Sequence, residues 1–147
     1  ALAKDFAGSD SLAVILGDNI FEDSFAKDVR NFSTGAKIFL KKVVDPRRFG
    51  VPVFGSNHVK HVEEKPEKPK SEYAVTGFYL FDNSVFDIIK SLVPSLRGEL
   101  EITDTVNAYA KQGGLSHAVL SGYWADAGTF ASLLAASNWA ARKLDDN

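Results

Sequence analysis

The 147-residue chain lacks cysteine and methionine, and its charges nearly cancel, with 17 Lys and Arg residues against 19 Asp and Glu residues. The absence of cysteine excludes disulfide bonds, thiolate metal sites and a thiol nucleophile. A formal net charge of −2 gives no electrostatic argument for nucleic-acid binding. No apolar run approaches the roughly 20 residues that a membrane helix needs. We therefore expect no nucleic-acid partner and no membrane partner.

Several catalytic motifs are also missing. The sequence contains no G-x-G-x-x-G, no G-x-x-x-x-G-K-[ST] and no G-x-S-x-G, which leaves no dinucleotide fingerprint, no Walker loop and no nucleophile elbow. The composition, 45% hydrophobic and 24% charged, is that of a globular protein, and the length fits a single domain over 1–147.

The hydrophobic pattern predicts an α/β protein with a β-hairpin insertion. Residues 12–16 form a continuous apolar run, which is typical of a strand buried on both faces in a parallel sheet. The pattern predicts further strands at 36–44, 73–81 and 115–120, and a hairpin over 51–54 and 59–64. Three- and four-residue spacing of apolar residues predicts helices at 22–33, 85–93, 104–112 and 130–144.

The strand predicted at 73–81 has the strongest pattern of aromatic and β-branched residues. Because side chains alternate along a strand, one face of it carries Tyr73, Val75, Gly77, Tyr79 and Phe81.

Two aspartates follow predicted strands. Asp18 comes directly after the first strand and Asp126 after the last, and ligands of open α/β sheets bind beyond the carboxyl ends of strands. Two carboxylates in one crevice, without cysteine or clustered histidine, would suit a hard cation such as Mg²⁺. Aspartate is also common in loops, so the residues alone leave open that both are turn or cap residues.

Two further charged segments have both a functional and a structural interpretation. The end of the hairpin, Glu63-Glu64-Lys65, would offer hydroxyl acceptors beside a phosphate-binding ammonium, or it is an exposed edge whose charges prevent aggregation. Arg97, which lies among acidic residues, is either a solvated ion pair or a phosphate clamp facing a pocket. The histidines lack further ligands nearby and predict no metal site.

Six motifs occur together and in order: LGDN at 16–19, FGV at 49–51, EEKP at 63–66, YAVTGFY at 73–79, RGELEITD at 97–104 and WADAGT at 124–129. This set, which spans nearly the whole chain, resembles the sugar nucleotidyltransferases, and among them the enzymes that transfer thymidylate to glucose 1-phosphate. The resemblance implies that a nucleoside triphosphate, with dTTP expected, reacts with glucose 1-phosphate to give a nucleotide sugar and diphosphate.

The resemblance also implies a role for particular residues. Asp18 and Asp126 would hold the catalytic Mg²⁺, while Lys65 and Arg97 would hold the sugar phosphate. The attacking group is then the sugar phosphate oxygen, so the protein would supply positive charge and in-line positioning rather than a covalent nucleophile.

The remaining residues implied by the resemblance form a sugar pocket. Gly50 would approach the sugar with its backbone, and Glu64 would accept hydrogen bonds from sugar hydroxyls. Val75 and Tyr79 would line the pocket, which agrees with the shared strand face inferred from the pattern alone.

The fold implied by the resemblance is a Rossmann-like mixed, mostly parallel sheet flanked by helices. The family begins with a strand and a Gly-rich loop that cradles the triphosphate, and no such loop precedes Ala1. We therefore expect the chain to be the C-terminal portion of the catalytic domain, with the metal and sugar-phosphate side, and to be inactive alone.

For the full-length protein we expect a cytoplasmic, homo-oligomeric enzyme of nucleotide-sugar biosynthesis. The alternatives are a non-catalytic sugar-phosphate-binding or assembly domain derived from the family, or a transferase for another nucleotide or sugar.

Overall fold

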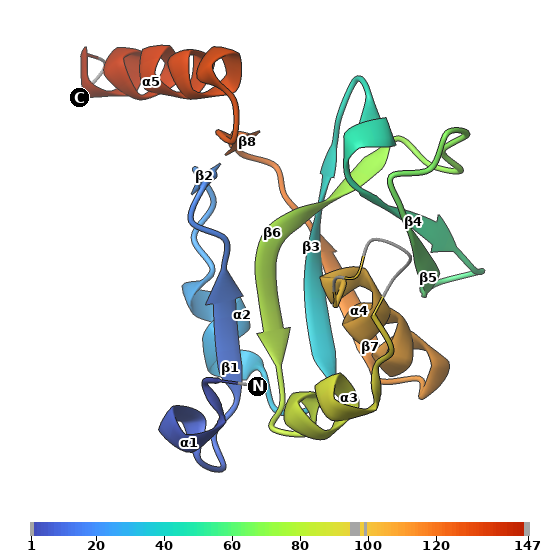
Figure 1. Cartoon of the computed structure of the whole chain (residues 1–147). Coiled ribbons are helices and arrows are strands. Elements are labelled where there is room, and N and C mark those ends of the chain that lie inside the picture. Colours follow the sequence, from blue (N-terminus) through green and yellow to red (C-terminus); the bar gives the residue numbers. More distant parts are fainter. Residues whose placement is uncertain (1, 95–97, 99, 146–147) are drawn as a thin grey trace.

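The centre of the molecule is a four-stranded sheet in the order β1-β6-β3-β7 (Figure 1). The computed structural model describes residues 2–94, 98 and 100–145. The strands of this sheet are β1 (Leu12–Ile15), β6 (Tyr73–Phe81), β3 (Ala36–Lys42) and β7 (Leu115–Val119). The mixed α/β architecture is confirmed, and β6 has the bounds that the sequence predicts.

The prediction of a mostly parallel sheet is wrong. Strand β6 pairs antiparallel with both β1 and β3, and only β3 and β7 pair in parallel among the described strands of this sheet. Parallel neighbours need a crossover connection, usually a helix. The chain instead passes from β3 to β6 through a β-hairpin and returns antiparallel beside β3.

Strand β1 is half-buried rather than buried on both faces, which corrects the interpretation of its apolar run. It lies at the edge of the described sheet, next to β6 only. Leu12 and Val14 pack against the core, whereas Ala13 is exposed and Ile15 has 58% of its surface exposed. The alternation shows that one face of β1 packs against the protein interior.

The sheet has a hydrophobic core on each face. On one face, Tyr79 and Phe81 of β6 stack in line with Tyr109, and α3 (Val85–Ser91) and α4 (Ile102–Lys111) cover them. On the other face, Phe78 stacks on Phe25 with 4.1 Å between ring centroids, near α2 (Ala26–Asn31). Each aromatic pair contributes about 1 kcal/mol beyond its buried area.

The predicted hairpin is confirmed as β4 (Gly50–Phe54) and β5 (Val59–Glu64), which follow a short 3-10 turn, η1 (Pro46–Arg48). Asn107 of helix α4 binds the free edge of strand β5 in this hairpin. The Asn107 amide accepts from the backbone N–H of Val62 at 2.7 Å and donates to its carbonyl at 2.9 Å. The side chain therefore takes the place of a neighbouring strand.

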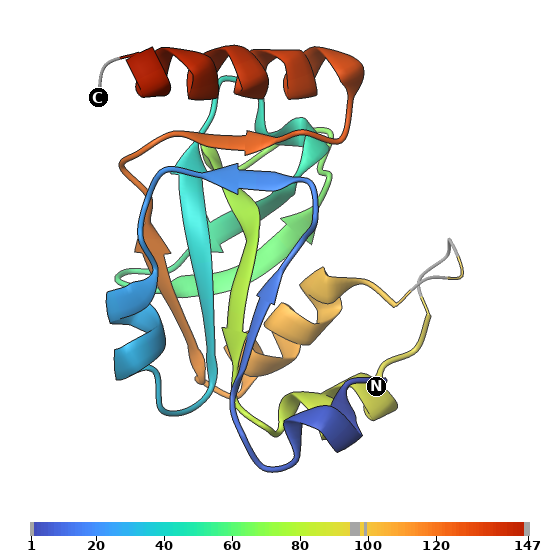
Figure 2. The ribbon, with the colours of Figure 1, turned by 90° about the vertical axis from the view of Figure 1, so that its left-hand side faces the viewer.

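A separate two-stranded ribbon joins the two ends of the sequence. It consists of β2 (Asn19–Phe21) and β8 (Trp124–Asp126), and α5 (Phe130–Asp145) lies over it (Figure 2). The sequence pattern predicts no strand at either position. Phe21 packs edge-on against Phe25 and Phe78, which attaches the ribbon to the sheet.

The helix predicted at 22–33 begins only at Ala26, because the side chains of residues 22 and 23 bind the backbone that leads into β8. Glu22 and Asp23 accept hydrogen bonds from the backbone N–H groups of Tyr123 and Gly122. The other helices are confirmed, and a short α1 (Lys4–Ala7) precedes β1. Over the described residues, no helix combines the length and apolar character required to cross a lipid bilayer.

Candidate functional site

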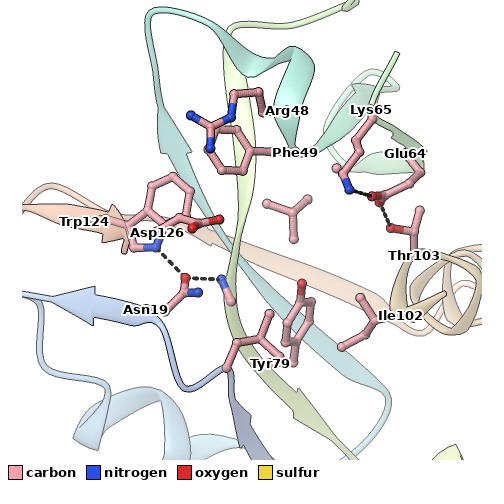
Figure 3. A pocket seen from close by; sticks show the side chains of 14 residues that line it. Asn19, Arg48, Phe49, Glu64, Lys65, Tyr79, Ile102, Thr103, Trp124 and Asp126 are labelled. Atoms are coloured by element: carbon pink, nitrogen blue, oxygen red, sulfur yellow. Dashed lines mark hydrogen bonds and ion pairs between the residues drawn. The ribbon is translucent and has the colours of Figure 1, made fainter. Parts of the chain in front are cut away.

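A cavity of about 210 Å³ lies between strand β6, the hairpin, the start of α4 and the β2–β8 ribbon (Figure 3). Trp124 and Asp126 form one side of it, and Glu64, Lys65 and Thr103 form the opposite side. The ribbon therefore brings the end of the chain to a site that is otherwise built by its middle.

Asp18 and Asp126 lie side by side because of the pairing in the ribbon. Asn19 pairs with Asp126 across the two strands, and the backbone N–H of Ala127 donates to the Asp18 carbonyl at 2.7 Å. A Cβ atom added to Gly128 would lie 3.0 Å from Asp126 Oδ1 and 3.1 Å from Asp18 Oδ2. Asp126 Oδ1 also accepts from the Gly128 N–H at 3.0 Å. The two carboxylates thus each place one oxygen at the same small space, which glycine leaves open.

This space has the donor chemistry of a hard-cation site. Its donors are two carboxylate oxygens, which suit a Mg²⁺ ion that keeps several waters and binds substrate phosphates. The part of the chain that the structure describes holds no cluster of three or more His, Cys, Asp or Glu side chains placed to bind a metal. The arrangement fits a cation whose remaining ligands come from water and substrate.

On the opposite side of the cavity, Glu64 is held by its neighbours. Thr103 Oγ1 donates to Glu64 Oε2 at 2.6 Å. A Cβ atom at Gly50 would lie 3.0 Å from Val62 Cγ1 and 3.6 Å from Glu64 Oε2. A side chain at position 50 would therefore fill the corner in front of the Glu64 carboxylate.

Lys65 has an unusual backbone conformation for a lysine. Its φ angle is 44°, and it is the one non-glycine residue with positive φ in the described part of the chain. The Lys65 N–H donates to the Phe49 carbonyl at 3.0 Å, and its ammonium lies 3.9 Å from the Glu64 carboxylate. Such strain costs about 1–3 kcal/mol and is common at functional sites.

Strand β6 supplies the floor of the cavity. Val75, Gly77 and Tyr79 all line it, so the predicted shared face is confirmed. Burial and, second, the negative charge of Glu64 raise the pKa of Tyr79 above its ordinary value. The Tyr79 hydroxyl therefore stays protonated and can donate a hydrogen bond to a ligand.

An aromatic wall with one cation borders the ribbon side. The Phe49 and Trp124 rings meet edge-on at 5.2 Å, and the Arg48 guanidinium lies 5.9 Å from the Phe49 ring. The adjacent Arg47 is held by two hydrogen bonds to Asp45, at 2.8 and 2.7 Å. No carboxylate among the described residues pairs with Arg48, so its charge is available at the cavity.

Most of the predicted site residues meet at this cavity. Those that line it are Gly50, Glu64, Lys65, Val75, Tyr79 and Asp126. Asp18 lies beside them next to Asp126, and Arg97 falls outside the described residues.

Sequence reasoning assigned no role to several lining residues: Asn19, Arg48, Phe49, Gly77, Thr103 and Trp124. Five of them, all except Arg48, fall inside the six motifs of the sequence. Their place in these motifs is the sequence feature that points to a role at the site. Arg48 directly precedes the FGV motif and carries no signal of its own.

The chain is similar to known proteins over nearly its whole length. The nucleotidyl transferase family model matches residues 1–143. The chain is 41% identical to the glucose-1-phosphate thymidylyltransferase of Neisseria meningitidis and 43% identical to that of Mycolicibacterium smegmatis, each over 94% of this chain and 50% of the relative. It thus spans about half the length of the curated relatives it matches.

A solved structure supports the same relationship. The crystal structure of a Bacillus anthracis protein assigned as a glucose-1-phosphate thymidylyltransferase, in complex with sucrose, is 51% identical to this chain, with a TM-score of 0.87. The match covers 95% of this chain and 58% of that one.

Proposed function

Because the chain belongs to the nucleotidyl transferase family, we propose that the full-length protein is a glucose-1-phosphate thymidylyltransferase, which makes dTDP-glucose and diphosphate from dTTP and glucose 1-phosphate. Relatives of that name are 41% and 43% identical to this chain. One observation carries the proposal. A single cavity has Asp126, with Asp18 beside it, on one side and the Glu64–Lys65 pair on the other.

In the proposed reaction, a phosphate oxygen of glucose 1-phosphate attacks the α-phosphorus of dTTP. A new phosphorus–oxygen bond forms, the bond from the α-phosphorus to the bridging oxygen breaks, and diphosphate leaves with the electron pair. The protein needs no covalent nucleophile, so its work is positioning and charge stabilisation. Lys65 holds the sugar phosphate, and we propose the same role for Arg97.

The sugar would lie on the β6 floor. Val75 offers it an apolar surface, and the protonated Tyr79 hydroxyl lies on the same strand face. Glu64 keeps one carboxylate oxygen for sugar hydroxyls while the other accepts from Thr103. Gly50 leaves room for the sugar beside Glu64, because a Cβ atom there would lie 3.6 Å from its oxygen.

We propose that Asp18 and Asp126 hold Mg²⁺. When bound, this ion supplies positive charge to the phosphate oxygens. The chain's own contribution is to keep the two carboxylates facing one space, through the ribbon pairing and the absence of a side chain at Gly128.

We also propose that the full-length protein is cytoplasmic and homo-oligomeric. Helix α5 supports the second part, because its Phe130, Leu134 and Leu144 are exposed and available for a contact between subunits. Sedimentation of the full-length protein tests the oligomeric state.

A substrate panel tests the proposal. The full-length protein is assayed for diphosphate release with dTTP, UTP, CTP, ATP and GTP, each with glucose 1-phosphate or galactose 1-phosphate. We expect the highest kcat/KM with dTTP and glucose 1-phosphate, and no release after chelation of Mg²⁺. Binding of glucose 1-phosphate without diphosphate release from any triphosphate would favour the non-catalytic alternative.

A further inference from the structure

The side-chain amide of Asn19 joins three elements of the site. Its Oδ1 accepts from the backbone N–H of Gly77 on β6 at 2.9 Å and from the indole N–H of Trp124 on β8 at 2.7 Å (Figure 3). Its Nδ2 donates to Asp18 Oδ1 at 2.9 Å. One side chain therefore contacts the cavity floor, the aromatic wall and one of the two facing carboxylates.

The orientation of this amide is fixed by the chemistry of its partners. The backbone N–H of Gly77 and the indole N–H of Trp124 can only donate. The amide oxygen must face both of them, which directs the amide nitrogen at Asp18.

Gly77 provides the room for this arrangement. A Cβ atom at Gly77 would lie 2.5 to 2.6 Å from all three terminal atoms of the Asn19 side chain. No side chain fits at position 77 while Asn19 occupies its place.

The hydrogen bond to Asp18 has a consequence for the metal site. Asn19 donates to Asp18 Oδ1, and the other oxygen, Oδ2, lies at the space shared with Asp126. We propose that Asn19 is a positioning residue that orients the Asp18 carboxylate for the cation by holding it against the backbone of strand β6. This inference rests on the proposed function, because the cation at Asp18 and Asp126 is itself part of that proposal.

Direct metal binding tests the inference without turnover. Mn²⁺ is titrated into the full-length protein and followed by electron paramagnetic resonance. Asn19→Ala should raise the half-saturating Mn²⁺ concentration at least tenfold and shift the ¹H–¹⁵N indole signal of Trp124, but not that of Trp139. The KM for glucose 1-phosphate should change less than threefold, since the hydrogen bonds of the Asn19 side chain among the described residues go to Asp18, Gly77 and Trp124 and not to Lys65.

Asn83→Ala is the matched control. The Asn83 amide donates to the carbonyls of Gly8 and Asp10 and lies outside the cavity. Its substitution removes hydrogen bonds of the same kind, and Mn²⁺ binding should stay within twofold of the wild type.

If Asn19→Ala does not fold, a second variant, Asn19→Asp, tests the inference. Asn19→Asp keeps both acceptor contacts, removes the donation to Asp18 and places a second negative charge beside the Asp18 carboxylate. It should retain the Trp124 indole signal and lower kcat at least tenfold, with KM for glucose 1-phosphate again within threefold.

The outcomes separate the inference from the proposed function. Weaker Mn²⁺ binding in Asn19→Ala, in a protein that releases no diphosphate, supports the inference and contradicts the proposed function. Mn²⁺ binding within twofold of the wild type in folded Asn19→Ala, or an unchanged kcat in Asn19→Asp, overturns the inference. A wild-type protein that binds no Mn²⁺, either alone or with dTTP present, overturns the inference, whereas the proposed function is decided by diphosphate release in the substrate panel.

Discussion

Asp18 Oδ2 and Asp126 Oδ1 lie 3.1 and 3.0 Å from one point, the position that a Cβ atom on Gly128 would take. The two aspartates come from opposite ends of the chain and meet through the β2–β8 ribbon. A glycine thus keeps open the space that both carboxylates face.

Gly128→Ala should close this space. The methyl group would lie between the two carboxylates, so we expect the half-saturating Mg²⁺ concentration for diphosphate release to rise at least tenfold. The φ angle of Gly128 is ordinary, and its substitution should change the melting temperature little. Gly17→Ala is the control, because nothing lies within 4 Å of its added Cβ atom. Equal Mg²⁺ dependence in both variants would contradict the assignment.

Arg48 and Arg47 are adjacent arginines in different environments. Arg48→Ala should raise the KM for at least one anionic substrate about tenfold or more, because a charge-assisted hydrogen bond contributes about 1.5 kcal/mol or more. Arg47→Ala should leave both KM values within twofold, since Arg47 is held by Asp45. Steady-state kinetics distinguish the two, and equal effects would remove Arg48 from the site.

The backbone conformation of Lys65 should lower the stability of the protein, while its ammonium should support substrate binding. Lys65→Gly and Lys65→Ala both remove the ammonium and should both raise the KM for glucose 1-phosphate. Only glycine relieves the positive φ of 44°, so the glycine variant should be more stable than the alanine variant by about 1 kcal/mol. At Lys68, where φ is not positive, the order should reverse. Urea denaturation measures the difference in unfolding free energy between the glycine and alanine variants. If glycine is the more stable variant, or the less stable one, at both Lys65 and Lys68, the Lys65 backbone is not strained.

Asp82 should make stability depend on pH in acid. Burial raises its pKa, but hydrogen bonds from Ser84, Gly35 and Tyr109 outweigh burial and lower it to about 2. The unfolded value is about 4, so the stabilisation is complete above pH 4 and is lost as the pH falls toward 2. It amounts to at most about 2 kcal/mol.

Urea denaturation of the wild type and Asp82→Asn between pH 2 and pH 6 measures this effect. The two unfolding free energies should converge as the pH falls. Asp87→Asn is the control, because the Asp87 side chain is 78% exposed. A constant difference between wild type and Asp82→Asn across this range would show that Asp82 does not titrate as described.

Elements with a long pattern were predictable from the sequence. Strand β6 has nine residues, and its alternation gave both its bounds and the face that lines the cavity. The hairpin was predictable because its turn residues are local. Both features depend on neighbouring residues, so one sequence carries enough information to predict them.

The β2–β8 ribbon was not predictable, for a physical reason. Each strand has three residues, too few to show a period. Its stability comes from distant partners, such as Phe78 for Phe21 and the backbone of Gly122 for Asp23. Asn19 was missed for the same reason, since Gly77 and Trp124 lie far from it in sequence. The burial of β1 on both faces was wrongly predicted because a continuous apolar run does not show which elements cover each face or in which direction the neighbouring strand runs.

The most direct test of the account is diphosphate release by the full-length protein and its Asp126→Asn variant, with dTTP, glucose 1-phosphate and Mg²⁺. The substitution keeps the size of the side chain and removes the charge proposed to bind the cation. The account predicts release by the wild type and a kcat at least about a hundredfold lower in the folded variant, a loss of about 2.7 kcal/mol or more in transition-state stabilisation. A variant that retains the wild-type kcat at the same Mg²⁺ concentration would contradict it.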